Sequence, residues 1–158
     1  MKELLPIYTE RLKIVETSID DIDLILKMDK QDSTQKYLGG IKNKSREERL
    51  DFLSKKKNSL TVLLDNTRIG FVGLKINEDK AEISYIFDSD YTGEGYCSEV
   101  VKVLVDISFN KLNLTKLYAY TKEDNVASIK VLTKNEFIKK DSNEEFIYYE
   151  LERGSLWK

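Results

Sequence analysis

The segment Tyr91-Thr92-Gly93-Glu94-Gly95-Tyr96-Cys97-Ser98 constrains this chain most, because it separates two different patterns. An apolar, strand-like run ends at Phe87, and a helical pattern begins near Glu94. Two glycines allow a tight turn, and the N–H groups at the start of a helix attract anions. The segment therefore predicts either a phosphate-binding loop or a tight strand-to-helix turn without a ligand, and its neighbours must decide.

The length of 158 residues predicts a single domain, residues 1–158, around one core. Hydrophobic residues make up 41% and charged residues 34% of the chain, which excludes a disordered or membrane protein. The longest apolar runs, such as Thr61–Leu64, are too short to span a bilayer. The start, Met1–Pro6, contains an acid and lacks the apolar core of a signal peptide, so we expect a cytoplasmic location.

Cysteine and histidine usage limits the chemistry. The single cysteine, Cys97, excludes an internal disulfide, and histidine is absent. A zinc site is disfavoured, and any proton transfer must use carboxylates, hydroxyls, lysine or water. The formal net charge of -2 provides no broad basic surface, so we expect no nucleic-acid partner and no metal.

The first half of the chain predicts a strand over Arg11–Glu16 and then two helices. Ser18 and Ser45 each precede an acid by three residues, which is typical of a capping box. From Leu60 onward the apolar residues recur at every second position. Turn residues separate three strand-like runs: Leu60–Leu64, Ile69–Ile76 and Ala81–Phe87. These runs predict an antiparallel meander.

The second half predicts a long helix over Glu94–Lys111, a buried strand over Lys116–Tyr120 that pairs in parallel, and a helix over Asn125–Lys134. A final hairpin pairs Phe137–Lys140 with Phe146–Leu151. The fold class that follows is α+β, with a mixed, mostly antiparallel sheet of about seven strands and about four helices.

Four motifs and the phenylalanine after the last one resemble a known family. They are Thr9–Ile14, Ile69–Leu74, Ala81–Tyr85, the run Glu123-Asp124-Asn125-Val126-Ala127-Ser128 that continues to Leu132, and Phe137. Together they resemble the GCN5-related N-acetyltransferase (GNAT) superfamily, and within it the Rim-type ribosomal-protein alanine N-acetyltransferases. The resemblance covers nearly the whole chain and implies a single-domain GNAT-like fold.

The resemblance implies direct transfer of an acetyl group from acetyl-CoA to a primary amine, without a metal. It assigns the coenzyme pyrophosphate to the backbone N–H groups of Thr92, Gly93, Glu94, Gly95, Tyr96, Cys97 and Ser98. The main chain of Ile86 and Phe87 would pair with the pantetheine amides as an added strand. Asn125 and Ser128 would also contact the coenzyme.

The phosphate loop departs from the family pattern at three positions. Thr92 stands where the family has Gln or Arg, and Cys97 stands where it has Gly or Ala. Glu94 replaces a residue that is commonly basic, so its carboxylate should weaken pyrophosphate binding.

Two further departures lie near the last predicted helix. Leu132 stands where many superfamily members have a tyrosine general acid, an absence shared by much of the Rim-type branch. Glu136 replaces the glycine before Phe137, which suggests that Asn135 takes the left-handed position at the helix end.

Glu82 is the leading candidate for the general base, since some relatives carry a catalytic carboxylate on this strand; the alternative is a glutamate that faces solvent or pairs with lysine. Ser128 could orient the coenzyme sulfur or protonate the leaving thiolate through water, or could be a hydroxyl on a helix face that binds the coenzyme. Asn125 could cap the last helix as well as contact the coenzyme. Tyr148 and Tyr149 alternate on the last strand, so one should be core and the other could face the acceptor.

Cys97 has two interpretations. A position near a helix N-terminus could lower its pKa and make it oxidisable, but packing as a small residue is favoured.

These features predict a cytoplasmic acetyl-CoA-dependent N-acetyltransferase whose acceptor is the α-amine of a protein or peptide. The alternatives are a small amine such as an antibiotic, polyamine or metabolite, or a catalytically weak acyl-CoA-binding regulatory domain. Acceptor identity should depend on Gln31–Lys44 and Asp141–Glu145. A homodimer is compatible with these features.

Overall fold

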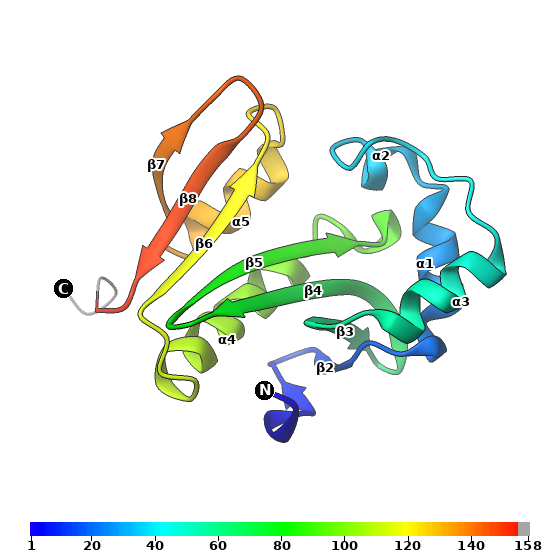
Figure 1. Ribbon diagram of the computed structural model, residues 1–158, viewed down its shortest axis with the longest axis horizontal. Coiled ribbons are helices and arrows are strands. Elements are labelled where there is room, and N and C mark those ends of the chain that lie inside the picture. Colours follow the sequence, from blue (N-terminus) through cyan, green and yellow to red (C-terminus); the bar gives the residue numbers. More distant parts are fainter. Residues whose placement is uncertain (155–158) are drawn as a thin grey trace. The chain divides into compact units, whose positions relative to one another are not determined.

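The computed structural model describes residues 1–154, in which eight strands follow the order β1-β2-β3-β4-β5-β6-β8-β7 (Figure 1). The strands are β1 (Ile7–Tyr8), β2 (Lys13–Glu16), β3 (Ser59–Leu64), β4 (Thr67–Asn77), β5 (Lys80–Phe87), β6 (Lys116–Thr121), β7 (Ile138–Ser142) and β8 (Ile147–Glu152). β5 and β6 are parallel, whereas β1–β2, β2–β3, β3–β4, β6–β8 and β7–β8 are antiparallel.

Within the same residues, five α-helices and three short 3₁₀-helices connect the strands. The α-helices are α1 (Ile22–Asp29), α2 (Asp32–Gln35), α3 (Arg46–Lys55), α4 (Tyr96–Asn110) and α5 (Val126–Lys134). The 3₁₀-helices are η1 (Lys2–Leu4), η2 (Ile19–Asp21) and η3 (Ser89–Tyr91). The predicted α+β class with a mostly antiparallel sheet is confirmed. The strand and the helix beyond the expected numbers, β1 and α2, are too short to show a periodic sequence pattern.

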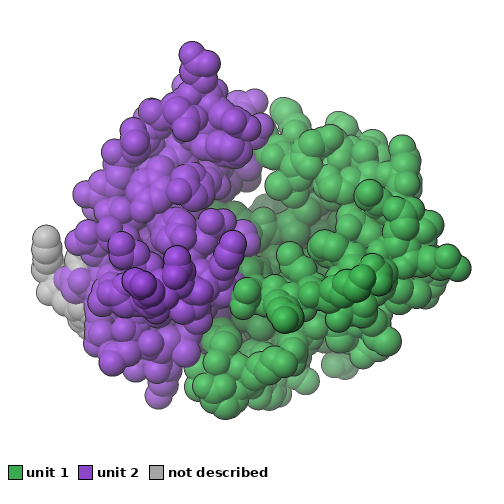
Figure 2. All heavy atoms as spheres, in the orientation of Figure 1, with its two compact units in different colours: residues 1–73, 85–96 green, residues 74–84, 97–158 purple. Residues whose placement is uncertain are grey.

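The chain groups into two compact units, which Figure 2 colours separately. The first comprises residues 1–73 and 85–96, and the second comprises residues 74–84 and the chain from 97 onward. β4 and β5 pass from one unit to the other. None of the helices in residues 1–154 has the length and apolar character that a membrane crossing requires.

Both predicted capping boxes are present in the first unit. Ser45 accepts a hydrogen bond from the backbone N–H of Glu48 at 3.1 Å, and the Glu48 carboxylate accepts from the Ser45 N–H at 3.1 Å. Ser18 and Asp21 form the equivalent pair, but they cap η2, and α1 follows from Ile22. Both boxes satisfy N–H groups that a helix start otherwise leaves without acceptors.

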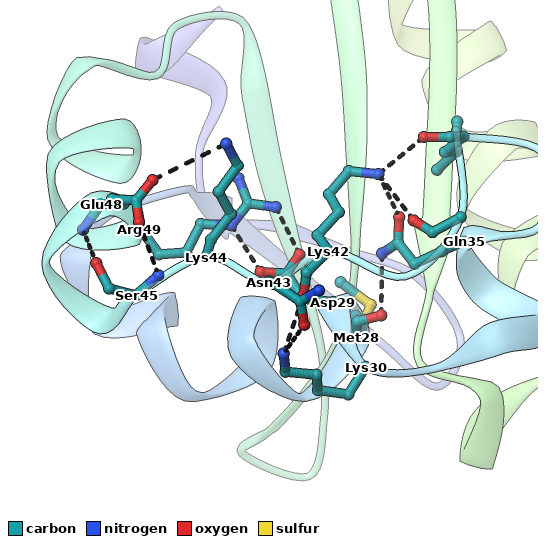
Figure 3. A network of polar contacts seen from close by, with 12 residues as sticks. Met28, Asp29, Lys30, Gln35, Lys42, Asn43, Lys44, Ser45, Glu48 and Arg49 are labelled. Carbon is teal, nitrogen blue, oxygen red and sulfur yellow. Dashed lines mark hydrogen bonds and ion pairs between the residues drawn. The ribbon is translucent and has the colours of Figure 1, made fainter.

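α1 and α3 pack together in the first unit through an apolar cluster and a buried ion pair. The cluster contains Ile22, Ile25 and Leu53, with Leu26, Leu50 and Phe71 against it. Arg49 on α3 donates two hydrogen bonds to the Asp29 carboxylate, at 2.7 and 2.5 Å (Figure 3). Because only 2% of the Asp29 side chain is exposed, this bidentate pair supplies the counter-charge that burial requires.

The core of the second unit lies on the inner side of β6 and β8 and along α4. Val100, Val101 and Leu104 on α4 are fully buried, as the helical period predicts. Leu117 and Leu151 face each other across the β6–β8 pair and are also buried. β7 pairs with β8 in the antiparallel sense, which confirms the predicted final hairpin, but all of β7 is exposed and only β8 contributes to the core.

The end of α5 corrects one expectation. Asn135 does not adopt a left-handed conformation, because its φ is -97°, whereas Glu136 has φ of +69°. The N–H of Glu136 bonds to the carbonyl of Thr133, and the N–H of Phe137 bonds to that of Leu132, which is the Schellman pattern. Asn135 is therefore the C-cap residue, and the left-handed residue is the one that follows it.

Candidate active site

The phosphate loop predicted from the sequence, residues 92–98, begins one residue after η3; we call it the coenzyme loop. Thr92 starts it with a hydrogen bond from its hydroxyl to the Ser89 carbonyl at 3.0 Å. Gly93 and Gly95 have φ of +84° and +81°, which only glycine adopts without strain. α4 starts at Tyr96, two residues later than predicted, because these glycines hold the backbone outside the helical region.

Space around the two glycines differs. A Cβ added to Gly93 would meet no heavy atom within 4 Å, whereas one added to Gly95 would lie 3.6 Å from Nη2 of Arg11. At Gly93 the need for glycine is therefore conformational alone. The open side of the loop is where a ligand could approach the backbone closely.

Arg11 lies two residues before the start of β2 and contacts the coenzyme loop. Its Nη2 donates to the Glu94 carbonyl at 3.0 Å, and its guanidinium carbon lies 4.4 Å from the centre of the Tyr96 ring. In the sequence, Arg11 stands out only as part of a strand motif, and nothing indicates this contact, since 83 residues separate it from Glu94. The Glu94 side chain is exposed. The loop therefore carries an exposed carboxylate of its own, and the Arg11 cation contacts it from outside.

In the second unit, Glu82 on β5 lies opposite Tyr118 on β6 in the parallel register. Both side chains are half-buried. Burial raises the pKa of Tyr118, and the nearby Glu82 charge raises it further. Tyr118 therefore remains protonated at neutral pH, beside the carboxylate predicted to act as base.

Four aromatic rings gather on β6, on β8 and at the residue before β8, and neighbouring ring centres are 5.3 to 6.4 Å apart: Tyr118, Tyr120, Phe146 and Tyr148. The Tyr148 hydroxyl donates to Glu150 at 2.9 Å, and burial together with this bond raises the pKa of Tyr148. Tyr149 points the other way and is buried, so it is the core member of the tyrosine pair. Sequence alternation could identify this face, but not the convergence of rings from two strands.

An open groove of about 600 Å³ lies at the ends of these strands. Its lining is mostly polar and acidic: Lys122, Glu123, Asp124, Asn143, Glu144, Glu145, Phe146 and Ile147. The Lys122 ammonium lies 5.4 Å from the centre of the Phe146 ring, within cation–π range. The groove includes much of the predicted acceptor segment Asp141–Glu145.

Asn125 and Ser128 meet at the start of α5. Asn125 Oδ1 accepts the backbone N–H of Ser128 at 3.2 Å, so Asn125 is the N-cap that the sequence predicted. Ser128 is half-buried. Leu132, at the position of the family's tyrosine acid, is fully buried and lies in the core.

Cys97 and Ser98 begin the second unit's part of the coenzyme loop. Burial raises the pKa of the Cys97 thiol, so the idea of a lowered pKa is wrong, and the packing interpretation agrees with the structure. Asn135 Nδ2 donates to Ser98 Oγ at 3.1 Å and to its carbonyl at 3.3 Å. This amide connects the end of α5 to the first turn of α4.

Residues 11–138 match the sequence profile of the acetyltransferase (GNAT) domain. The chain is a GNAT acetyltransferase. The match spans most of its length and includes the coenzyme loop, Glu82, Asn125 and Ser128. The superfamily predicted from the sequence is thereby confirmed.

Relatives match this acetyltransferase over most of its length in sequence or in structure. An uncharacterized N-acetyltransferase p20 of Bacillus licheniformis is 26% identical, over 95% of this chain and 90% of its own. A GNAT-family acetyltransferase from Bacillus anthracis superposes with a TM-score of 0.83 at 21% identity, covering 92% of this chain and 97% of its own.

Two solved structures from Vibrio cholerae have the same fold and different named activities. One, described as a candidate ribosomal-protein-serine acetyltransferase, has a TM-score of 0.78 at 17% identity, covering 96% of this chain and 99% of its own. The other is a spermidine N-acetyltransferase in complex with CoA and spermine, with a TM-score of 0.78 at 17% identity, covering 94% and 99%. At such identities the likeness establishes the fold and does not choose an acceptor.

Proposed function

We propose that this acetyltransferase uses acetyl-CoA in the cytoplasm to acetylate the α-amine of a protein or peptide. The observation that carries the donor assignment is the coenzyme loop, in which Gly93 and Gly95 have positive φ directly before α4. N–H groups in the first turn of a helix have no acceptor within the helix and favour anions. The pyrophosphate is assigned to residues 92–98 on this basis.

The reaction needs a neutral amine whose nitrogen attacks the thioester carbonyl carbon. Glu82 takes the proton from the amine, directly or through water, because the chain has no histidine. The carbon–sulfur bond then breaks, and the CoA thiolate takes up a proton. Ser128 is the candidate that delivers this proton through water, since the buried Leu132 has no proton to give.

The acidity of the acceptor favours an α-amine over a lysine side chain. An α-amine has a pKa near about 8, against about 10.4 for lysine, so far more of it is neutral at physiological pH. A carboxylate is a weak base and cannot readily deprotonate a lysine ammonium group. Catalysis by Glu82 is therefore fastest with an amine that is already partly neutral. The Rim-type resemblance agrees with this choice.

The acidic groove favours a polyamine as a second candidate acceptor. Glu123, Asp124, Glu144 and Glu145 line it, and the Lys122 ammonium already lies over the Phe146 ring. Carboxylates and aromatic faces together attract extended cations. One fold relative is a spermidine N-acetyltransferase, which supports a polyamine as the second candidate.

Acceptor competition separates the candidates. At pH 7.5, acetyl-CoA is offered with a peptide that has a free N-terminus and blocked lysine, with its converse, and with spermidine. Faster acetylation of the first peptide supports the proposal, whereas acetylation of spermidine alone favours the second candidate. CoA binding without turnover on any amine would indicate a regulatory acyl-CoA-binding domain.

The coenzyme assignment is tested separately by calorimetry with CoA. Gly95→Val places a branched side chain at φ of +81° on the open loop and should weaken CoA binding strongly. Unchanged CoA affinity in a folded variant would exclude this loop as the pyrophosphate site.

A further inference from the structure

Asp88 is the first residue after β5, and its carboxylate is the centre of a small polar network. Only 2% of its side chain is exposed. It accepts hydrogen bonds from Lys27 Nζ at 2.7 Å, from Gln31 Nε2 at 2.8 Å and from the Asp90 N–H at 3.0 Å. Two helical segments of the first unit thus meet the start of η3 at one buried carboxylate.

Gln31 uses both ends of its amide group in this network. While Nε2 donates to Asp88, Oε1 accepts the backbone N–H of Ser89 at 2.9 Å and the Thr34 hydroxyl at 2.7 Å. Gln31 occupies the N-cap position of α2, yet its side chain makes no capping bond there. Its amide therefore links the segment before the coenzyme loop to Thr34 on α2, through a side-chain contact and not through a backbone cap.

The network is ionised across the neutral range. Burial alone would raise the pKa of Asp88, but hydrogen bonds from Lys27, Gln31 and the Asp90 N–H outweigh burial and lower it. The hydrogen bonds to Asp88 and then to Asp90 raise the pKa of Lys27. Both groups are therefore charged at neutral pH, and the contact between Lys27 and Asp88 is a charge-assisted hydrogen bond.

Residues 31–44, which we call the acceptor loop, are held together by hydrogen bonds among their own side chains and carbonyl groups. Lys42 Nζ donates to Gln35 Oε1 at 3.0 Å, to the Leu38 carbonyl at 2.8 Å and to the Gly40 carbonyl at 3.3 Å (Figure 3). Gln35 Nε2 donates to the Met28 carbonyl at the end of α1. A displacement of Gln31 would therefore be transmitted along this segment rather than absorbed by it.

A continuous path of hydrogen bonds joins the two loops. Thr92, in the coenzyme loop, bonds to the Ser89 carbonyl, and the Ser89 N–H bonds to Gln31. We propose that Gln31 and Asp88 are positioning residues that couple the loops, so that coenzyme binding stabilises the acceptor loop against local opening before the amine arrives. The coupling rests on the proposed function, and linkage requires that a stabilised acceptor loop favour coenzyme binding by the same factor.

Hydrogen exchange followed by mass spectrometry tests the coupling with CoA alone as the probe, without an acceptor. In the wild-type protein, saturating CoA should slow exchange in residues 88–98 and, by about fivefold or more, in residues 31–44. Gln31→Met keeps the side-chain length and removes both polar ends. It should leave protection of residues 92–98 in place at saturating CoA while abolishing the CoA-dependent protection of residues 31–44.

Asp90→Asn is the matched control. Asp90 also pairs with Lys27, at 2.8 Å, but its carboxylate is exposed and makes no contact with Gln31. This variant should keep the protection of both segments. Circular dichroism shows whether each variant is folded before exchange is measured.

The outcomes separate the coupling from the function. If CoA fails to bind the wild-type protein by calorimetry, the proposed function is wrong, and the coupling falls with it. If CoA binds and protects residues 92–98 but not residues 31–44, or if Gln31→Met protects both segments as the wild type does, the coupling alone is wrong.

Discussion

Gly70 on β4 offers the sharpest test of how the first unit positions Ile86 and Phe87 at the end of β5. A Cβ built at this position would lie 2.7 Å from two ring carbons of Phe87 and 3.0 Å from the Ile86 carbonyl oxygen. Real Cβ atoms do not approach so closely, and the carbonyl belongs to backbone. Gly70→Ala must therefore displace Phe87, Ile86 or β4 itself.

The expected cost follows from that geometry. Gly70 lies outside the left-handed region, so alanine adds no backbone strain, and overpacking is the only penalty, at about 1–3 kcal/mol. For a chain of this size that lowers Tm by roughly 2–12 °C. Because Ile86 and Phe87 are the residues assigned to pantetheine, CoA affinity should fall as well.

Thermal unfolding by circular dichroism and calorimetry with CoA measure both effects. Gly154→Ala is the contrasting control, since nothing in residues 1–154 lies within 4 Å of its Cβ and its φ of +90° adds only strain, about 1–2 kcal/mol. It should leave CoA affinity unchanged. A Gly70→Ala protein with wild-type Tm and CoA affinity would refute the steric argument.

Three other changes probe the base, the buried ion pair and the loop network. Glu82→Gln should reduce turnover on the order of 10²-fold with CoA affinity retained, and equal turnover with an unchanged pH profile would remove Glu82 as base. Arg49→Met leaves the Asp29 carboxylate buried without its partner and should cost about 3–5 kcal/mol in urea unfolding; a loss below about 1 kcal/mol would contradict this. The lowered pKa of Asp88 contributes stability that is present above pH 4 or so and is lost as pH falls through its folded value. The stability difference between wild type and Asp88→Asn should therefore shrink on acidification, and a pH-independent difference would show that Asp88 is not ionised in the folded state.

Local signals explain which parts of the fold the sequence could predict. A capping box depends only on residues within one helix turn, and the acid three residues after Ser45 forms one in the structure. Apolar alternation depends only on residues within one strand, and the runs from Leu60 to Phe87 form strands as predicted. The misplaced left-handed residue after α5 differs by a single position. There, the Asn135 side chain bonds to Ser98, a contact that no local pattern carries.

The candidate site was predictable only where its residues are adjacent in sequence. The glycine pair and Asn125 could be read directly, because their geometry is set by the next few residues. Arg11 and Gln31 could not, since their partners lie 83 and 57 residues away. Such contacts form only through tertiary packing, and neither the local charge pattern nor the hydrophobic periodicity of the sequence indicates them.

The raised pKa of Lys27 has a consequence for an enzyme that acetylates amines. Only a neutral amine attacks a thioester, and the hydrogen bonds to Asp88 and Asp90 keep the Lys27 nitrogen protonated. Its lone pair is therefore withheld from acetyl-CoA, even though the residue is bonded to the segment that leads into the coenzyme loop. We therefore expect Lys27 to resist self-acetylation because of the same hydrogen bonds that connect α1 to this segment.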